Sequence, residues 1–201
     1  MIELEQDNGL WIVTINRPDK ANSLTGDMLE RLCEIAESAQ EARGLILTGA
    51  GKVFSAGADL DAAKAGLATS PLWERLSGAI AALPGLTIAA LNGTLAGGAN
   101  GMALACDLRL AVPGAKVFYP VMKLGYLPQP SDPKRMTALI GPARTKLILM
   151  GGQKITAQDA FAFGLVDRLV EGDVVAAARE IAADTLAARP DIAVGIKDMC
   201  R

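Results

Sequence analysis

The amino-acid sequence predicts an α/β fold, and three observations lead to this prediction. Short apolar runs of strand length alternate with longer segments of helical periodicity, as in proteins built on a largely parallel sheet. The length of 201 residues corresponds to one domain. Hydrophobic residues make up 51% of the chain and charged residues 21%, a balance that supports a sizeable core and excludes bulk disorder.

The first elements along the chain are a hairpin, a helix and a buried strand. Asp7-Asn8-Gly9 supplies turn chemistry between two strand-like runs, which predicts a β-hairpin over residues 2–15. Thr25 has the chemistry of a helix N-cap, and the helix behind it is predicted to run to about residue 42. Residues 44–48 are continuously apolar, which is typical of a strand buried in a parallel sheet.

The alternation continues, and beyond Pro120 the chain becomes mostly helical. Further strands are predicted at 87–91, 108–112 and 117–119. Helices are predicted at 59–65, 71–83, 98–106, 133–140, 142–150, 156–163, 174–187 and 190–200. This order predicts an α/β core with a helical C-terminal region packed on it.

The absence of histidine restricts the chemistry open to this chain. A Ser-His-Asp triad, a Cys-His dyad and a histidine-ligated zinc site are all excluded. Any proton transfer or nucleophilic attack must use carboxylates, lysine, tyrosine, cysteine or serine, and any electrostatic stabilisation can also use backbone dipoles.

Charge and cysteine usage exclude several classes of protein. The net charge is −2 with both signs dispersed, which argues against a nucleic-acid partner. Three cysteines without a CxxC pair predict reduced thiols rather than a disulfide framework. The acidic first residues, 1–5, are not a signal peptide, and no apolar run approaches the ~20 residues of a membrane span. We expect a soluble, cytoplasmic protein.

Two glycine-rich segments, 54–60 and 92–99, stand out as candidate binding loops. Each follows a buried strand and leads into a helix, where backbone N–H groups lack partners and small side chains let a ligand approach closely. Two converging N–H groups, one from each loop, would form an oxyanion hole for a developing enolate. The alternative interpretation is a pair of ordinary tight turns, and these residues alone leave both open.

Taken with other segments, these loops resemble the crotonase superfamily, the enoyl-CoA hydratase/isomerase family. The resemblance runs nearly end to end. The segments that carry it are 16–24, 49–60, 92–98, 106–109, 123–125, 155–160 and 164–167. The run Phe54-Ser55-Ala56-Gly57-Ala58-Asp59-Leu60 is the most specific of them.

The resemblance implies a ββα spiral core over residues 1–141 and a helical region over 142–201, together forming a single crotonase-like domain with a shortened C-terminal region. It implies an acyl-CoA thioester as ligand, with coenzyme A as part of the substrate. No metal and no permanently bound cofactor are expected. Family members assemble as trimers or dimers of trimers, so a homotrimer or hexamer is expected.

The resemblance also implies a set of site residues. The thioester oxygen is expected between the backbone N–H groups of Ala56 and Gly98. The remaining expected coenzyme A contacts are Lys20, Ala21, Gly57, Ala58, Asp59, Leu60 and Gly97.

This sequence departs from the family at the two glutamates that hydratases use for proton transfer. The first should fall three residues after the oxyanion glycine, where this chain has Gly101. The second should fall before the Lys-Leu-Gly segment, where this chain has Val121. Neither replacement can move a proton, so ordinary two-glutamate hydration is not expected.

Asp132 is the new carboxylate near the expected pocket and the candidate substitute acid or base. It lies in residues 129–134, where relatives carry a glycine-rich loop. The competing interpretation is structural. Asp132 precedes Pro133, the pairing expected of an N-cap and a first helical residue, and a capping carboxylate is a weak base because backbone N–H bonds favour its charged form.

Other side chains near the pocket are expected to provide shape, hydrogen bonds or structural support. These are Trp73, Asn100, Asp107, Arg109, Tyr119, Lys123, Tyr126 and Ser131. The chain also ends before the terminal helices of full-sized relatives, which predicts a more open site or a different arrangement of partners.

Two functions follow from this sequence. The first is a divergent family enzyme, a lyase or isomerase, that stabilises a thioester enolate in a backbone oxyanion hole. Its reaction would be a hydratase or isomerase step, a decarboxylation or a thioester hydrolysis. The alternative is a non-catalytic acyl-CoA binder or regulatory subunit, which the missing glutamates favour.

Overall fold

The fold is built on two β-sheets in a computed structural model that describes residues 1–200. The strands of the larger sheet run in the order β1-β2-β3-β5-β7-β10, and those of the smaller sheet in the order β4-β6-β8-β9. The larger sheet contains β1 (Ile2–Asp7), β2 (Leu10–Ile15), β3 (Gly44–Gly49), β5 (Leu86–Leu91), β7 (Leu108–Ala111) and β10 (Arg168–Leu169). The smaller sheet contains β4 (Val53–Ser55), β6 (Thr94–Ala96), β8 (Lys116–Phe118) and β9 (Ile155–Thr156).

Helices surround these sheets. The α-helices are α1 (Gly26–Ser38), α2 (Leu60–Lys64), α3 (Leu72–Ala82), α4 (Ala99–Ala105), α5 (Val121–Leu124), α6 (Asp132–Leu149), α7 (Ala157–Phe163), α8 (Val174–Ala187) and α9 (Pro190–Met199). Short 3-10 helices are η1 (Pro18–Lys20), η2 (Ala39–Glu41) and η3 (Leu67–Thr69). Within residues 1–200, no helix combines the length and apolarity needed to cross a membrane.

Successive strands of the larger sheet each lead into a strand of the smaller one and then into helix. β3 is followed by β4 and α2, β5 by β6 and α4, and β7 by β8 and α5. This repeat confirms the predicted ββα spiral. The sequence pattern missed β4, β6 and α5, because three or four residues beside glycine or proline carry too little periodicity to reveal an element.

The predicted hairpin is confirmed. β1 and β2 pair antiparallel with Asp7 opposite Leu10, so the loop is Asn8-Gly9. Both loop residues have positive φ, 49° and 86°, which is the backbone of a two-residue hairpin turn. All other pairings in the larger sheet are parallel.

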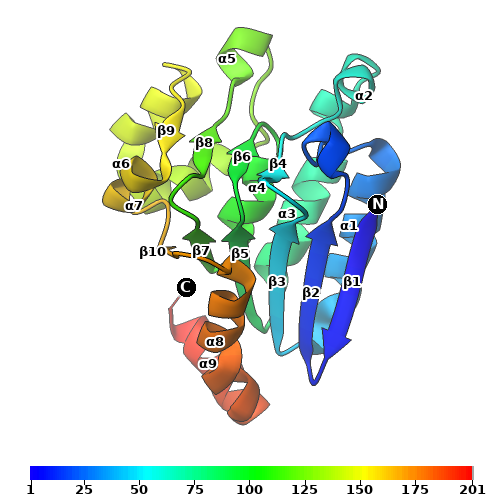
Figure 1. Cartoon of the computed structure of the whole chain (residues 1–201), viewed down its shortest axis with the longest axis vertical. Coiled ribbons are helices and arrows are strands. Elements are labelled where there is room, and N and C mark those ends of the chain that lie inside the picture. The colour runs from blue at the N-terminus through cyan, green and yellow to red at the C-terminus, as the bar shows by residue number, and fades with distance from the viewer. Residues whose placement is uncertain (201) are drawn as a thin grey trace.

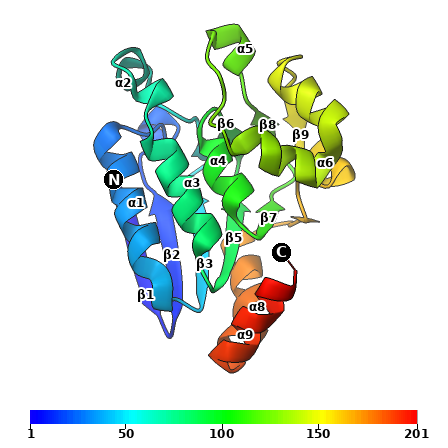
Figure 2. The same cartoon turned by 180° about the vertical axis from the view of Figure 1, so that it is seen from behind.

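Alternating side chains of the larger sheet form two cores. On β3, Leu45 and Leu47 face the core shared with α1, α3 and α4, whereas Ile46 faces the core shared with α8. Figure 2 shows α1, α3 and α4 side by side across one face of the sheet, and Figure 1 shows α8 against the other. Burial on both faces explains why these strands are continuously apolar in sequence.

Helix α6 joins the two helices predicted at 133–140 and 142–150. Gly141, with φ 76° and ψ 165°, breaks the helical geometry between them, and Pro142 follows. The helix also begins one residue earlier than predicted, at Asp132, with Ser131 as its N-cap. This shift changes the role of Asp132, as described below.

Candidate active site

A cavity of about 360 Å³ opens beyond the ends of three parallel strands of the smaller sheet. β4 leads into the loop before α2, β6 leads into Gly97 and Gly98, and β8 leads into Tyr119 and Pro120. Because parallel strands end at the same edge of a sheet, these three loops meet, and all three line the cavity. In Figure 1 this region lies at the top, between α2 and α5.

Many of the site residues predicted from the sequence line this cavity. Ala56, Ala58, Leu60, Gly97, Gly98 and Val121 line it, together with Trp73, Tyr119 and Tyr126. Lys64 is the one charged side chain among the described lining residues. Lys20, Ala21, Gly57, Asp59, Gly101 and Asp132 do not line the cavity, although several of them support its walls.

The two glycine-rich loops touch at Gly57. This residue has φ 86°, and a Cβ atom placed there would lie 2.9 Å from the carbonyl oxygen of Ala96 and 3.3 Å from the nitrogen of Gly98. A side chain would therefore be strained by the backbone and would push the loops apart. The glycine brings the 54–60 loop against the start of α4.

In the loops from β4 to α2 and from β6 to α4, the cavity-lining backbone N–H groups without a hydrogen-bond partner among the described residues are those of Ala58 and Gly98. The N–H of Ala56, predicted from sequence as a donor, instead donates to the carbonyl oxygen of Ala21 at 3.0 Å. The geometry thus favours Ala58 over Ala56 as the partner of Gly98. Sequence alone could not separate the two, because the distinction depends on a bond to the distant Ala21.

A polar network holds the loop that carries Ala58. The side chain of Asn22 donates to the carbonyl oxygen of Val53 at 2.6 Å and to that of Ala50 at 2.9 Å. The hydroxyl of Ser55 donates to the carbonyl oxygen of Asn22 at 2.8 Å and accepts from the N–H of Gly57 at 3.1 Å. These bonds fix the path of the loop between β4 and α2.

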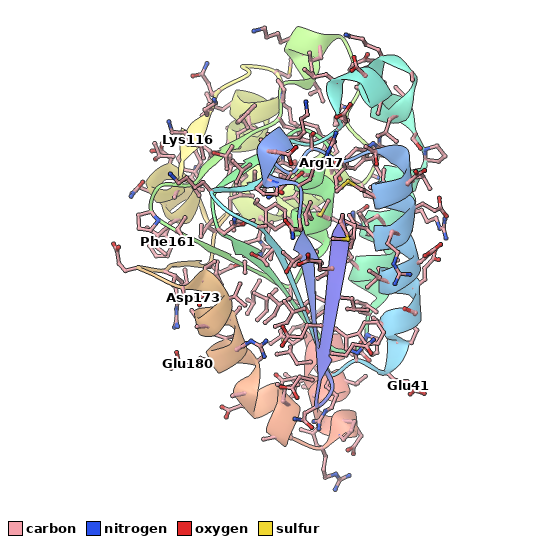
Figure 3. The ribbon with its side chains drawn as sticks, turned by 45° about the vertical axis from the view of Figure 1, so that its right-hand side comes forward. Arg17, Glu41, Lys116, Phe161, Asp173 and Glu180 are labelled. Carbon is pink, nitrogen blue, oxygen red and sulfur yellow. The ribbon has the colours of Figure 1, made fainter. Side chains whose placement is uncertain are left out.

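An ion pair closes the same loop. Arg17 lies just beyond β2 (labelled in Figure 3), and its Nη1 donates to Oδ2 of Asp59 at 2.8 Å. Asp59 is the N-cap of α2, and its hydrogen bond from Arg17 holds the pKa of its carboxyl below the ordinary value. Arg17, Asn22 and Ser55 were in the motifs that carried the resemblance, but their supporting roles became visible only through their contacts.

Asp132 does not cap its helix. Its side chain is fully buried, Oδ2 accepts a hydrogen bond from the Tyr119 hydroxyl at 2.9 Å, and Oδ1 has no partner among the described residues. The N-cap residue Ser131 is held instead by Glu74 of α3, which accepts from its N–H and its hydroxyl. The predicted capping role of Asp132 is therefore wrong, since α6 begins one residue earlier than expected.

The electrostatics of Asp132 also differ from those of a capping residue. Burial raises the pKa of its carboxyl to about 6, and the nearby Glu74 adds to the rise. The hydrogen bond from Tyr119 and the charge of Arg135 oppose it. An aspartate in this environment is a stronger base than an exposed one.

Tyr119 lies between the cavity and Asp132, and its backbone is attached to the Gly98 loop. The carbonyl oxygen of Phe118 accepts from the N–H of Gly97 at 3.2 Å and from the Asn100 side chain at 3.1 Å. Burial is the main cause that raises the pKa of the Tyr119 hydroxyl above its ordinary value. Asn100 thus has the hydrogen-bonding role expected of it.

Two remaining candidates, Trp73 and Arg109, hold parts of the surrounding structure together. The Trp73 indole donates to the carbonyl oxygen of Leu67 at 2.7 Å, and its ring packs against Gly98, where an added Cβ would lie 3.1 Å away. Arg109 is buried, donates to the carbonyl oxygens of Cys106 and Leu165, and pairs with Asp167 at 3.0 Å. The structural role predicted for Arg109 agrees with these contacts.

Fold and site together define a crotonase-type ββα spiral with a cavity at the ends of its smaller-sheet strands. A family profile described as enoyl-CoA hydratase/isomerase matches residues 5–201. The chain belongs to the enoyl-CoA hydratase/isomerase family.

Relatives with several different activities are similar to this chain. It is 36% identical over 193 residues to the putative enoyl-CoA hydratase/isomerase YngF of Bacillus subtilis, covering 91% of this chain and 74% of that protein. It is 34% identical to the short-chain-enoyl-CoA hydratase of Clostridium acetobutylicum, covering 89% of this chain and 72% of the relative. It is 30% identical to human ethylmalonyl-CoA decarboxylase, covering 83% of this chain and 57% of the relative.

Solved structures agree on the fold. The enoyl-CoA hydratase from Bacillus anthracis superimposes with a TM-score of 0.90 at 32% identity, covering 98% of this chain and 81% of the other. DspI of Pseudomonas aeruginosa superimposes with a TM-score of 0.90 at 30% identity, covering 99% and 85%.

Proposed function

We propose that this protein is an enzyme that binds an acyl-CoA thioester in the cavity and stabilises its enolate with the N–H groups of Ala58 and Gly98. The observation that carries the proposal is that two unpartnered backbone donors from two different loops line the same cavity. Such donors act on an oxyanion without side-chain chemistry, and removing one donor from a hole of this kind reduces the rate about 100-fold or more.

The cavity suits a short acyl group. Its volume of about 360 Å³ falls at the lower end of small-molecule sites, and its walls are mostly apolar. Coenzyme A would extend along the residues of the 54–60 loop, Gly97 and the η1 segment with Lys20 and Ala21. The exposed side chain of Leu60 lies at the cavity margin, where it can contact the ligand.

Electrostatics favour proton transfer over decarboxylation. A malonyl-type substrate would bring a second carboxylate into a mostly apolar cavity. Lys64, the one charged side chain among the described lining residues, is exposed and already pairs with Asp61, so it offers that carboxylate little compensation. The buried Asp132, with a pKa of about 6, adds a negative charge near the site at neutral pH. We therefore propose a hydratase or isomerase type of step, in which a proton moves at the α-carbon.

A second candidate is a non-catalytic acyl-CoA binder. It is favoured by Gly101 and Val121, which offer no ionisable group where the family's hydratases carry glutamates. Under this function the protein would bind the thioester tightly and leave it unchanged.

Turnover separates these candidates. The purified protein would be mixed in turn with crotonyl-CoA, ethylmalonyl-CoA and butyryl-CoA, with binding followed by calorimetry and reaction by thioester absorbance and product chromatography. Conversion of crotonyl-CoA is the expected result. Binding without conversion of any of the three supports the second candidate, and absence of binding contradicts both.

A matched pair of substitutions at Gly98 tests the donor itself. Gly98 has φ −59°, which proline adopts, so Gly98→Pro deletes the N–H at a backbone φ that the proline ring allows. Gly98→Ala adds the same Cβ, 3.1 Å from the Trp73 ring, and keeps the N–H. We expect about a 100-fold larger loss of kcat for the proline variant than for the alanine variant. Equal losses would mean that the N–H plays no part.

A further inference from the structure

We propose that Tyr119 is the residue that exchanges a proton with the bound thioester, and that Asp132 acts through it as a carboxylate supplied by α6 instead of α4. This inference rests on the proposed function and specifies how a chain without the two family glutamates moves the α-proton. Three contacts carry it: Asp132 with Gly101, Asp132 with Tyr119, and Tyr119 with the cavity.

The first contact puts the Asp132 carboxylate against the position of a missing glutamate. A Cβ atom at Gly101 would lie 2.8 Å from Oδ1 of Asp132 and 3.2 Å from Oδ2. No side chain can share that space without displacing the carboxylate. The glycine of α4 and the aspartate of α6 are therefore complementary, since one makes the room that the other fills.

The second and third contacts link Asp132 to the cavity through Tyr119. Asp132 is fully buried and does not line the cavity, so it cannot touch a ligand there. Tyr119 does line the cavity, and its hydroxyl donates to Oδ2 of Asp132 at 2.9 Å. With its proton directed at Asp132, the hydroxyl oxygen is left as an acceptor for a proton from the substrate.

The surroundings of Asp132 make it a suitable proton acceptor. Its Oδ1 is buried without a partner in residues 1–200, a costly arrangement that a purely structural carboxylate would avoid. The charged groups that influence it are Glu74 on α3 and Arg135 on α6. Helix α4, which packs against α6, carries no ionisable side chain. Burial is the largest influence and favours the protonated carboxyl.

The proton transfer balances over these groups. The Cα–H bond of the thioester breaks, and its electron pair forms the enolate, whose oxygen accepts from the N–H groups of Ala58 and Gly98. The released proton bonds to the Tyr119 oxygen while the original hydroxyl proton moves to Oδ2 of Asp132. Tyr119 remains neutral and Asp132 becomes a neutral acid, so the reverse steps return a proton to the substrate.

Deuterium exchange at the α-carbon measures this transfer without knowledge of the full reaction. Butyryl-CoA would be incubated with the protein in D₂O, with uptake followed by mass spectrometry and binding by calorimetry. We expect exchange by the wild type, and a loss of about 100-fold or more in Tyr119→Phe and in Asp132→Asn, with butyryl-CoA still bound. The wild-type exchange rate should rise with pH through about 6, and Asp132→Asn should lose that rise.

A glycine pair controls for packing. Gly101→Ala displaces the carboxylate without removing it and should slow exchange. Gly78→Ala adds a methyl group to α3 where no described heavy atom lies within 4 Å apart from the adjacent residues and backbone of the helix itself, and should leave exchange unchanged. If the wild type binds butyryl-CoA without exchange, or if Tyr119→Phe exchanges as fast as the wild type, the proton transfer through Tyr119 is refuted. Neither result would contradict acyl-CoA binding. Absence of butyryl-CoA binding would instead contradict the proposed function.

Discussion

Burial of Asp132 makes the stability of this protein depend on pH in a direction opposite to that of most aspartates. Because burial disfavours the charged carboxyl, the folded protein holds this proton to a higher pH than the unfolded chain does. The contribution of Asp132 to the free energy of unfolding therefore falls as pH rises from about 4 to about 6, and stays at its low value above that.

The size of the effect follows from the two pKa values. The carboxyl has a pKa of about 6 in the folded protein against an ordinary value of 3.8. At 1.36 kcal/mol for each unit, the difference corresponds to about 3 kcal/mol of lost stability at neutral pH. Asp132→Asn removes the charge and keeps an acceptor for the Tyr119 hydroxyl. The variant should gain about 3 kcal/mol relative to wild type between pH 4 and pH 7.

Urea unfolding of both proteins, followed by tryptophan fluorescence across this pH range, measures the gain. Asp27→Asn serves as the control. Asp27 and Asp132 both lie in the first turn of a helix, α1 and α6, but Asp27 is exposed and Asp132 is buried. A difference between wild type and Asp132→Asn that is the same at every pH would refute the argument that burial of this charge is costly.

Three further substitutions test the supporting structure. Gly57→Ala should abolish acyl-CoA binding measured by calorimetry, because the added Cβ would lie 2.9 Å from the Ala96 carbonyl oxygen at a φ of 86°. Arg109→Met should lower the free energy of unfolding by about 3 kcal/mol in urea titrations, since it leaves the buried carbonyl oxygens of Cys106 and Leu165 without their side-chain donor and removes the ion pair with Asp167. Lys197→Met should speed amide hydrogen exchange in α9 with little effect elsewhere, because Lys197 attaches that helix through the Gly85 carbonyl oxygen and Asp107.

Much of the fold could be read from local patterns. The hairpin turn at Asn8-Gly9, the cap at Thr25 and the buried strand β3 each depend on residues close together in the chain. The strands β4 and β6 were missed because their three residues are held by pairing with each other and not by local preference. The family motifs compensated for this, since they carry the spiral as a whole.

In the candidate site, too, some features could be predicted from contiguous sequence and others depend on distant residues. The glycine-rich loops were recognisable because a strand, a glycine turn and a helix start are contiguous in sequence, and their unpartnered N–H groups follow from that geometry. The choice between Ala56 and Ala58 was not recognisable, because it depends on the carbonyl oxygen of Ala21. Similarly, Ser131, the N-cap residue of α6, is held by Glu74, a residue of another helix.

The sequence by itself determined the family, the α/β spiral and the two loops that could hold an oxyanion, since each of these depends on motifs of consecutive residues. The tertiary structure decided what Asp132 does. Whether that carboxylate caps a helix or lies buried against Gly101 and Tyr119 depends on how α6 packs on α3 and α4. Burial and through-space contacts set the chemistry of an ionisable group, and neither is encoded in the residues beside it.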